Sequence, residues 1–149
     1  MSDASRTPLF VDTGGFYAVF DEDDAEHDRS STVFDGIRDG SLSYGPVYTS
    51  RYVLSELATL MLYNIRHSAA VEALDTILGS STFNVLPVDP PTFAAAREQF
   101  KQYDDQAISF VDHLGAVLAR GRGIAHVFAF DSDFATLGFT RVPVDTGEN

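Results

Sequence analysis

Two carboxylates stand directly after apolar segments, where they could do chemistry. Asp12 follows Leu9–Val11, and Asp131 follows Ile124–Phe130. If both segments are parallel strands, their carboxyl ends meet at one edge of a sheet, and ligands bind at such edges. Each aspartate could instead only cap a following helix. The spacing alone leaves both interpretations open.

Glu56 is the only carboxylate in the apolar segment Tyr52–Ile65. A helix that is apolar nearly all round is expected to be buried. A buried carboxylate without a partner costs several kcal/mol or has its pKa raised until it is neutral. Because no cation lies between Arg51 and Arg66, a metal or an incoming polar group would satisfy Glu56. The alternative is a glutamate at the helix edge that faces solvent or pairs with a distant arginine.

Asp112 lies in the predicted helix Ser109–Arg120, three residues after Ser109. This spacing resembles a capping box, and an acid in the first turn also suits the helix dipole. Asp112 shares a helix face with small residues, which would allow the helix to pack closely near the sheet edge. Asp133, two residues after Asp131, is expected to be auxiliary.

Four carboxylates that converge on one sheet edge would repel each other unless a cation lay between them. Oxygen ligands of this kind suit Mg²⁺ or Mn²⁺, which can orient a water and stabilise charge on a phosphodiester. Other chemistries fit less well. The chain has no cysteine for a thiol nucleophile, a disulfide or a thiolate zinc site, and no glycine-rich phosphate loop. Its four histidines are scattered and are not paired as zinc ligands.

The order of strands and helices predicts an α/β sandwich around a mostly parallel sheet. Continuous apolar runs such as Ile124–Phe130 are typical of parallel strands covered on both faces. The strands are expected at Leu9–Asp12, Pro46–Thr49, Phe83–Val88, Ile124–Phe130 and Phe139–Val144. We expect one domain over residues 1–149, with flexible tails at 1–7 and 145–149.

The charge balance is strongly acidic. Ten basic residues against 22 acidic ones give a net charge of −12, and Lys101 is the only lysine. This indicates either a self-repelling soluble protein or adaptation to a cytoplasm rich in salt, as in halophiles. It argues against non-specific duplex binding, since no broad basic patch is available. No apolar run could span a bilayer and the first residues lack a secretory core, so we expect a cytoplasmic protein.

Three segments resemble the PIN-domain family of ribonucleases. They are LFVDTGGFYAVFDEDDAEHDRS, YTSRYVLSELATLML and YDDQAISFVDHLGAVLARGRGIAHVFAFDSDFATLGF, and the resemblance runs over roughly residues 8–144. The last segment is the most specific. The resemblance implies a PIN-like three-layer sandwich with a central sheet of four to five strands flanked by helices. A stand-alone domain of this length resembles the VapC-type toxins of toxin–antitoxin pairs.

The resemblance implies a Mg²⁺- or Mn²⁺-dependent ribonuclease, usually a homodimer, inhibited by a small antitoxin that inserts into the active groove. Asp12 and Asp112 would be the main metal ligands, Glu56 would complete the site, and Asp131 would hold a second metal or the water. The remaining site residues that it implies are Thr13 and Ser109 as supports for the carboxylates, and Arg51, Arg120 and Arg122 as weak RNA contacts. The alternative is a non-catalytic PIN-like interaction module or a housekeeping RNA-processing nuclease.

Overall fold

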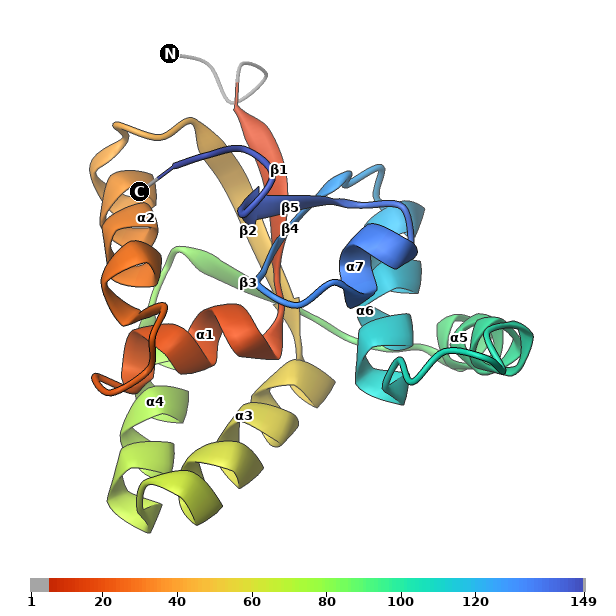
Figure 1. The fold of residues 1–149 in the computed structure, drawn as a ribbon, viewed down its shortest axis with the longest axis horizontal. Coiled ribbons are helices and arrows are strands. Elements are labelled where there is room, and N and C mark those ends of the chain that lie inside the picture. Colours follow the sequence, from red (N-terminus) through yellow and green to blue (C-terminus); the bar gives the residue numbers. More distant parts are fainter. Residues whose placement is uncertain (1–5, 149) are drawn as a thin grey trace.

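A five-stranded, fully parallel sheet forms the centre of the protein (Figure 1). The structure is a computed structural model that describes residues 6–148. The strands are β1 (Thr7–Val11), β2 (Tyr44–Ser50), β3 (Phe83–Leu86), β4 (His126–Ala129) and β5 (Thr140–Pro143), in the spatial order β3-β2-β1-β4-β5. The predicted α/β architecture with a mostly parallel sheet is confirmed.

Helices cover the sheet and extend from its lower end in Figure 1. They are α1 (Thr13–Phe20), α2 (His27–Asp39), α3 (Arg51–Asn64), α4 (His67–Gly79), α5 (Pro90–Gln102), α6 (Phe110–Gly121) and α7 (Asp133–Thr136). Helices α1 and α2 lie on one side of the sheet and α6 and α7 on the other, which gives the three-layer arrangement. No helix within residues 6–148 is long and apolar enough to cross a membrane.

The strand order places a topological switch at β1. From β1 the chain builds outward through β2 to β3, and it then returns to add β4 and β5 on the other side of β1. In open α/β sheets, ligands bind beyond the carboxyl ends of the strands at such a switch. Asp12 and Asp131 follow β1 and β4, the two strands that flank this point.

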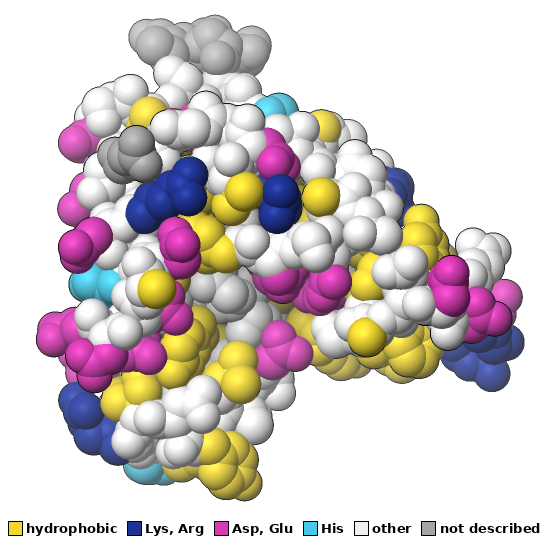
Figure 2. Space-filling view, in the orientation of Figure 1, with side chains coloured by type: hydrophobic (Ala, Val, Ile, Leu, Met, Phe, Trp, Pro, Cys, Tyr) yellow, Lys and Arg dark blue, Asp and Glu magenta, His cyan; other side chains and the backbone are white. Residues whose placement is uncertain are grey.

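The surface is hollowed at this end of the sheet. Figure 2 shows a concave region between the lobe of α3 and α4 and the projecting helix α5, with acidic side chains at its margin. The carboxyl ends of the strands therefore open onto a recess that a large ligand could enter.

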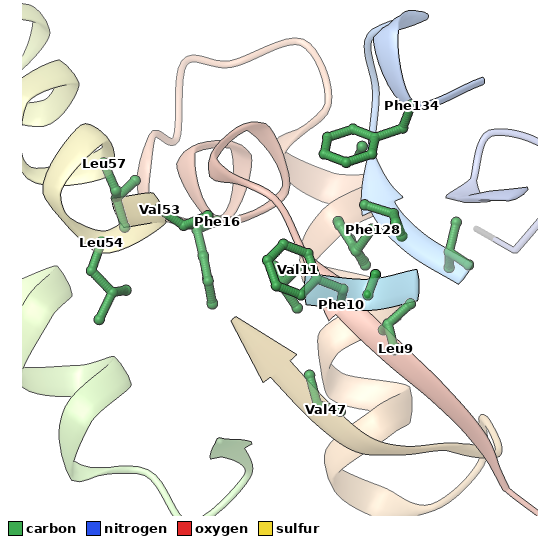
Figure 3. Close-up of a cluster of buried hydrophobic side chains, with 14 of the residues drawn as sticks. Leu9, Phe10, Val11, Phe16, Val47, Val53, Leu54, Leu57, Phe128 and Phe134 are labelled. Atoms are coloured by element: carbon green, nitrogen blue, oxygen red, sulfur yellow. The ribbon is translucent and has the colours of Figure 1, made fainter. Parts of the chain in front are cut away.

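The core is built from the strands and from the helix faces against them (Figure 3). Leu9, Phe10 and Val11 of β1 are fully buried, as expected for a strand covered on both faces. Phe128 of β4 stacks on Phe34 with ring centroids 4.7 Å apart. This core fixes β1 and β4, and through them the two aspartates that follow.

The flexible tails expected at 1–7 and 145–149 lie partly outside the described residues. Strand β1 begins at Thr7, which pairs with Tyr44 of β2, and residues 1–5 lie outside the described part. At the other end, the Asp145 carboxylate accepts hydrogen bonds from Arg141, and the Tyr44 hydroxyl donates to Glu148. Charged and phenolic groups of the sheet therefore hold residues 145–148, which composition alone did not indicate.

Candidate metal centre

Asp12 is buried at the switch point, directly after β1. Only 3% of the residue is exposed, and its side chain makes no capping hydrogen bond to α1. Its backbone N–H donates to the Phe128 carbonyl of β4 at 3.1 Å, which fixes its position relative to the neighbouring strand. The interpretation of Asp12 as only a helix cap is therefore wrong, and its carboxyl group needs another partner.

Close approach of α1 to β4 sets the direction in which the chain leaves Asp12. A Cβ at Gly15 would lie 2.3 Å from Cδ1 and 2.7 Å from the backbone oxygen of Phe128, so only glycine fits. The buried Ser30 hydroxyl donates to the Gly15 carbonyl at 3.0 Å. Together these contacts hold the first turn of α1 against the sheet.

Asp112, in the first turn of α6, lies beside Asp12. The Ser109 hydroxyl accepts a hydrogen bond from the Asp112 backbone N–H at 3.2 Å, so the predicted cap exists and orients the first turn. Ser109 thus supports Asp112 through its backbone and not through its carboxylate. A Cβ at Gly115 would lie 3.0 Å from Phe10 Cε1, which confirms the close packing expected of the small helix face.

The carboxyl groups of Asp12 and Asp112 hydrogen-bond to one another. Burial, followed by the charge of Asp131, raises the pKa of Asp12. Burial, followed by the charges of Asp12 and Asp131, raises the pKa of Asp112 further. The pair therefore shares a proton when no cation is present.

Asp131 and Asp133 complete an acidic cluster with Asp112. Carboxylate oxygens of these three residues can all lie within 4.8 Å of one another, a spacing suited to one metal ion. Asp131 Oδ1 also accepts a hydrogen bond from the Asp133 backbone N–H at 3.0 Å, so it orders the turn into α7 as well. Asp133, expected only as an auxiliary residue, is thus a full member of the cluster.

Glu56 is half-buried, and the prediction of a wholly buried helix around it is wrong. Helix α3 buries one face only, through Val53, Leu54, Leu57 and Met61. The other residues of α3 are exposed or half-buried. The Glu56 charge nevertheless contributes, as a minor cause after burial and Asp131, to the raised pKa of Asp12, so it lies within electrostatic range.

The cluster has no matching set of cations. None of the ion pairs within residues 6–148 involves these carboxylates. Burial raises the pKa of Asp131, and nearby Arg141 only partly opposes this. The Arg141 guanidinium instead donates to the Asp131 backbone carbonyl at 3.1 Å and pairs with Asp145.

Thr13 adds a polar atom that lacks a partner. Its hydroxyl is buried, and among the described residues it makes no hydrogen bond, including the expected one to a carboxylate. A buried hydroxyl of this kind costs free energy unless a ligand or water satisfies it. An orphaned hydroxyl beside buried acids fits a hydrated divalent cation.

The three arginines expected to contact RNA lie in different places. Arg51 is exposed at the start of α3. The Arg120 guanidinium donates to Gln99 and to the Leu137 carbonyl, and Arg122 lies over the Tyr48 ring at 5.2 Å. At about 1.5 Å per residue, Arg120 and Arg122 lie more than about 10 Å along α6 from Asp112. These two arginines therefore hold the fold together and do not line the carboxylates.

This chain belongs to the PIN domain family, whose model matches residues 9–140. It is 33% identical over 135 residues to the 23S rRNA-specific endonuclease VapC20 of Mycobacterium tuberculosis, covering 90% of this chain and 97% of that one. The crystal structure of VapC20, described as a Sarcin-Ricin loop cleaving toxin, matches with a TM-score of 0.80 over 90% of this chain and 98% of that chain.

More distant structures share the fold alone. VapBC2 from Rickettsia felis matches with a TM-score of 0.65 at 14% identity, over 91% of this chain and 97% of that one. FitAcB from Neisseria gonorrhoeae matches with a TM-score of 0.60 at 17% identity, over 89% of this chain and 94% of that one. The family resemblance expected from the sequence is confirmed.

Proposed function

We propose that this chain is a metal-dependent endoribonuclease and the toxin of a toxin–antitoxin pair. The observation that carries the proposal is the buried, hydrogen-bonded pair of Asp12 and Asp112 beside Asp131 and Asp133, which no ion pair within residues 6–148 neutralises. The homology to the VapC20 endonuclease supports the same activity.

Mg²⁺ or Mn²⁺ is the cation that these residues fit best, because the available donors are all hard oxygens. Asp12 and Asp112 would be the main ligands, Glu56 would complete the site, and Asp131 with Asp133 would hold a second metal or the water. The Thr13 hydroxyl would hydrogen-bond to a water of the hydrated ion. Such an ion supplies an activated water and stabilises negative charge on a phosphodiester.

A non-catalytic interaction module explains the site less well. Burial and mutual repulsion disfavour the ionised form of Asp12 and Asp112, so the cluster costs folding free energy. A surface that only binds another protein has no physical need for this cost. A housekeeping role in RNA processing is compatible with the same chemistry and differs only in the substrate.

The partners follow from the proposed role. The substrate is RNA, and ribosomal RNA is the first to test because the relative VapC20 is specific for 23S rRNA. A small antitoxin would inhibit the enzyme in the cytoplasm by entering the acidic recess. We also propose a homodimer that uses the exposed part of α3, where Tyr63 is 81% exposed.

The test compares purified wild-type protein with the Asp112→Asn variant on a panel of ribosomal and transfer RNAs. Asp75→Asn, which removes an exposed acid of α4, serves as the matched control. Wild type and the control should cleave in Mg²⁺ or Mn²⁺ and stop when a chelator is added, and Asp112→Asn should be inactive. Equal cleavage by all three proteins in chelator would show that the proposed chemistry is wrong.

A further inference from the structure

Four aromatic rings form a continuous row that crosses three helices. Tyr52 of α3 lies 6.5 Å from Phe93 of α5, measured between ring centroids. Phe93 lies 5.1 Å from Phe110 of α6, and Phe110 lies 5.6 Å from Phe100 of α5. The rings therefore touch in the order Tyr52, Phe93, Phe110 and Phe100, which we call the aromatic row.

Much of the aromatic row is open to solvent. Tyr52 and Phe93 are each 40% exposed, Phe100 is 46% exposed, and Phe110 between them is half-buried. Helix α5 packs against α6, yet Ala96 is its only buried residue. A contiguous exposed apolar surface of this kind marks a binding site in a soluble protein.

The aromatic row borders the acidic cluster. Tyr52 lies one helical turn before Glu56 on the same face of α3, and Phe110 belongs to the first turn of α6, which also carries Asp112. Figure 2 shows apolar side chains along α5 and α6 next to the acidic ones at the centre of the molecule. A ligand chain that reached the carboxylates would therefore also pass the rings.

The charge of the protein favours contacts to bases over contacts to phosphates. With a net charge of −12, the protein offers little general attraction for a polyanion. Unpaired bases are uncharged and stack on aromatic side chains without sequence preference. Arg51, beside Tyr52, and Arg97, one turn after Phe93, are exposed and could contact adjacent phosphates.

A protein partner would find a better surface elsewhere. The exposed aliphatic side chains Leu60, Leu62, Val71 and Leu78 all belong to the later part of α3 and to α4. The aromatic row presents flat rings to solvent, and through Tyr52 it lies on the same face of α3 as Glu56. Its composition thus fits nucleobases better than an apolar protein segment.

We propose that the aromatic row is a stacking platform for unpaired bases of the RNA beside the phosphodiester to be cleaved. This inference rests on the proposed ribonuclease function, and it assigns RNA recognition to rings where the sequence suggested arginines. The substrate class is accordingly RNA with a single-stranded or looped segment, and binding should not weaken as salt rises, because salt screens the repulsion between the acidic protein and the RNA.

The test measures fluorescence anisotropy of a labelled single-stranded RNA oligonucleotide with the intact protein in chelator, so that no cleavage occurs. Phe93→Leu and Phe100→Leu remove one ring each but keep an apolar side chain, while Phe93→Tyr keeps the ring. Leu78→Ala removes an exposed apolar side chain of α4 outside the row and is the matched control. Circular dichroism checks that each variant is folded.

Each leucine variant should bind the RNA between about five- and a hundredfold more weakly, from the usual cost of losing one stacked base. Phe93→Tyr and Leu78→Ala should bind like wild type. A second oligonucleotide of equal length with abasic sites keeps the phosphates, and it should bind wild type as weakly as the leucine variants bind normal RNA.

Equal affinity of wild type and both leucine variants would overturn the proposal. So would dissociation of a dimer by Phe93→Leu in light scattering, since the row would then be a subunit interface. Cleavage by wild type is assayed separately in Mn²⁺. If RNA affinity depends on the rings but wild type does not cleave RNA, the proposed nuclease function is wrong and the stacking platform stands. If wild type cleaves RNA but the affinity does not depend on the rings, only the stacking platform is wrong.

Discussion

The carboxyl groups of Asp12 and Asp112 hydrogen-bond to one another, although the two residues are far apart in the chain. One follows the central strand β1 and the other lies in the first turn of α6. Burial and mutual repulsion disfavour joint ionisation of two acids this close unless a cation lies between them. This pair therefore links metal binding, pH and stability.

We expect the metal-free protein to lose stability as the pH rises. Burial, first of all, raises the pKa of Asp12 to about 7 and that of Asp112 to about 9 in the fold. In the unfolded chain both pKa values return to about 4. The fold thus binds more protons than the unfolded chain above about pH 4, and its free energy of unfolding falls until both groups are ionised near pH 9.

Urea unfolding in chelator at several pH values measures this dependence. Asp112→Asn, which removes the shared proton, should show a shallower fall than wild type. In Mn²⁺ the trend should weaken, because the metal binds the ionised carboxylates and competes with protons. A metal-free stability that rises steadily between pH 5 and pH 9 would contradict the shared-proton interpretation.

Asp12→Asn should separate a ligand from a structural residue. The variant removes one charge and one ligand at constant shape, so in chelator it should be at least as stable as wild type. Wild type should gain about 2.7 kcal/mol from Mn²⁺ at a hundred times its dissociation constant, and the variant less. Thermal melts of both proteins, with and without Mn²⁺ at fixed high KCl, give the comparison. If Asp12→Asn is much less stable than wild type in chelator and is stabilised by Mn²⁺ as much as wild type, Asp12 is a structural residue and not a metal ligand.

Gly15→Ala should destabilise the fold by about 1–3 kcal/mol, since its Cβ would overlap the ring and the backbone oxygen of Phe128. Gly14→Ala is the matched control. The Cβ added there meets only Asp12 Oδ2, at 3.8 Å, and alanine favours a helix over glycine. Denaturant melts of both variants check this, and equal midpoints would show that α1 does not depend on this close contact.

Stability should increase with salt. The net charge of −12 opposes compaction, and screening grows as the Debye length falls to about 3 Å at 1 M. The melting temperature, measured in chelator from low to molar KCl, should therefore rise. A flat or falling melting temperature would remove the argument for adaptation to high salt.

The protein should form a dimer in high salt at micromolar concentration. Leu60, Leu62 and Tyr63 leave apolar surface of α3 exposed, and a second copy would cover it. Light scattering should give twice the mass of the chain, and Tyr63→Ser should shift the equilibrium toward monomer. A monomeric wild type would show that the proposed dimer is wrong and that the apolar surface of α3 binds a different partner.

The sequence by itself determined the strands, their parallel arrangement and the edge at which Asp12 and Asp131 emerge. These properties follow from local patterns, because an apolar run bounded by turn residues predicts a strand wherever it packs. The cap formed by Ser109 and the close packing of Gly115 could likewise be read from spacing within one helix.

Only the tertiary structure decided which side chains meet. Helix α3 looked buried from its composition, yet Glu56 is half-exposed because α3 buries one face only. Asp133 belongs to the acidic cluster, and Arg120 contacts Gln99 away from the carboxylates. Neither placement could be predicted, because spacing within a segment says nothing about the neighbouring elements. The contact between Tyr52 and Phe93, from helices distant in sequence, exists only once the chain has folded.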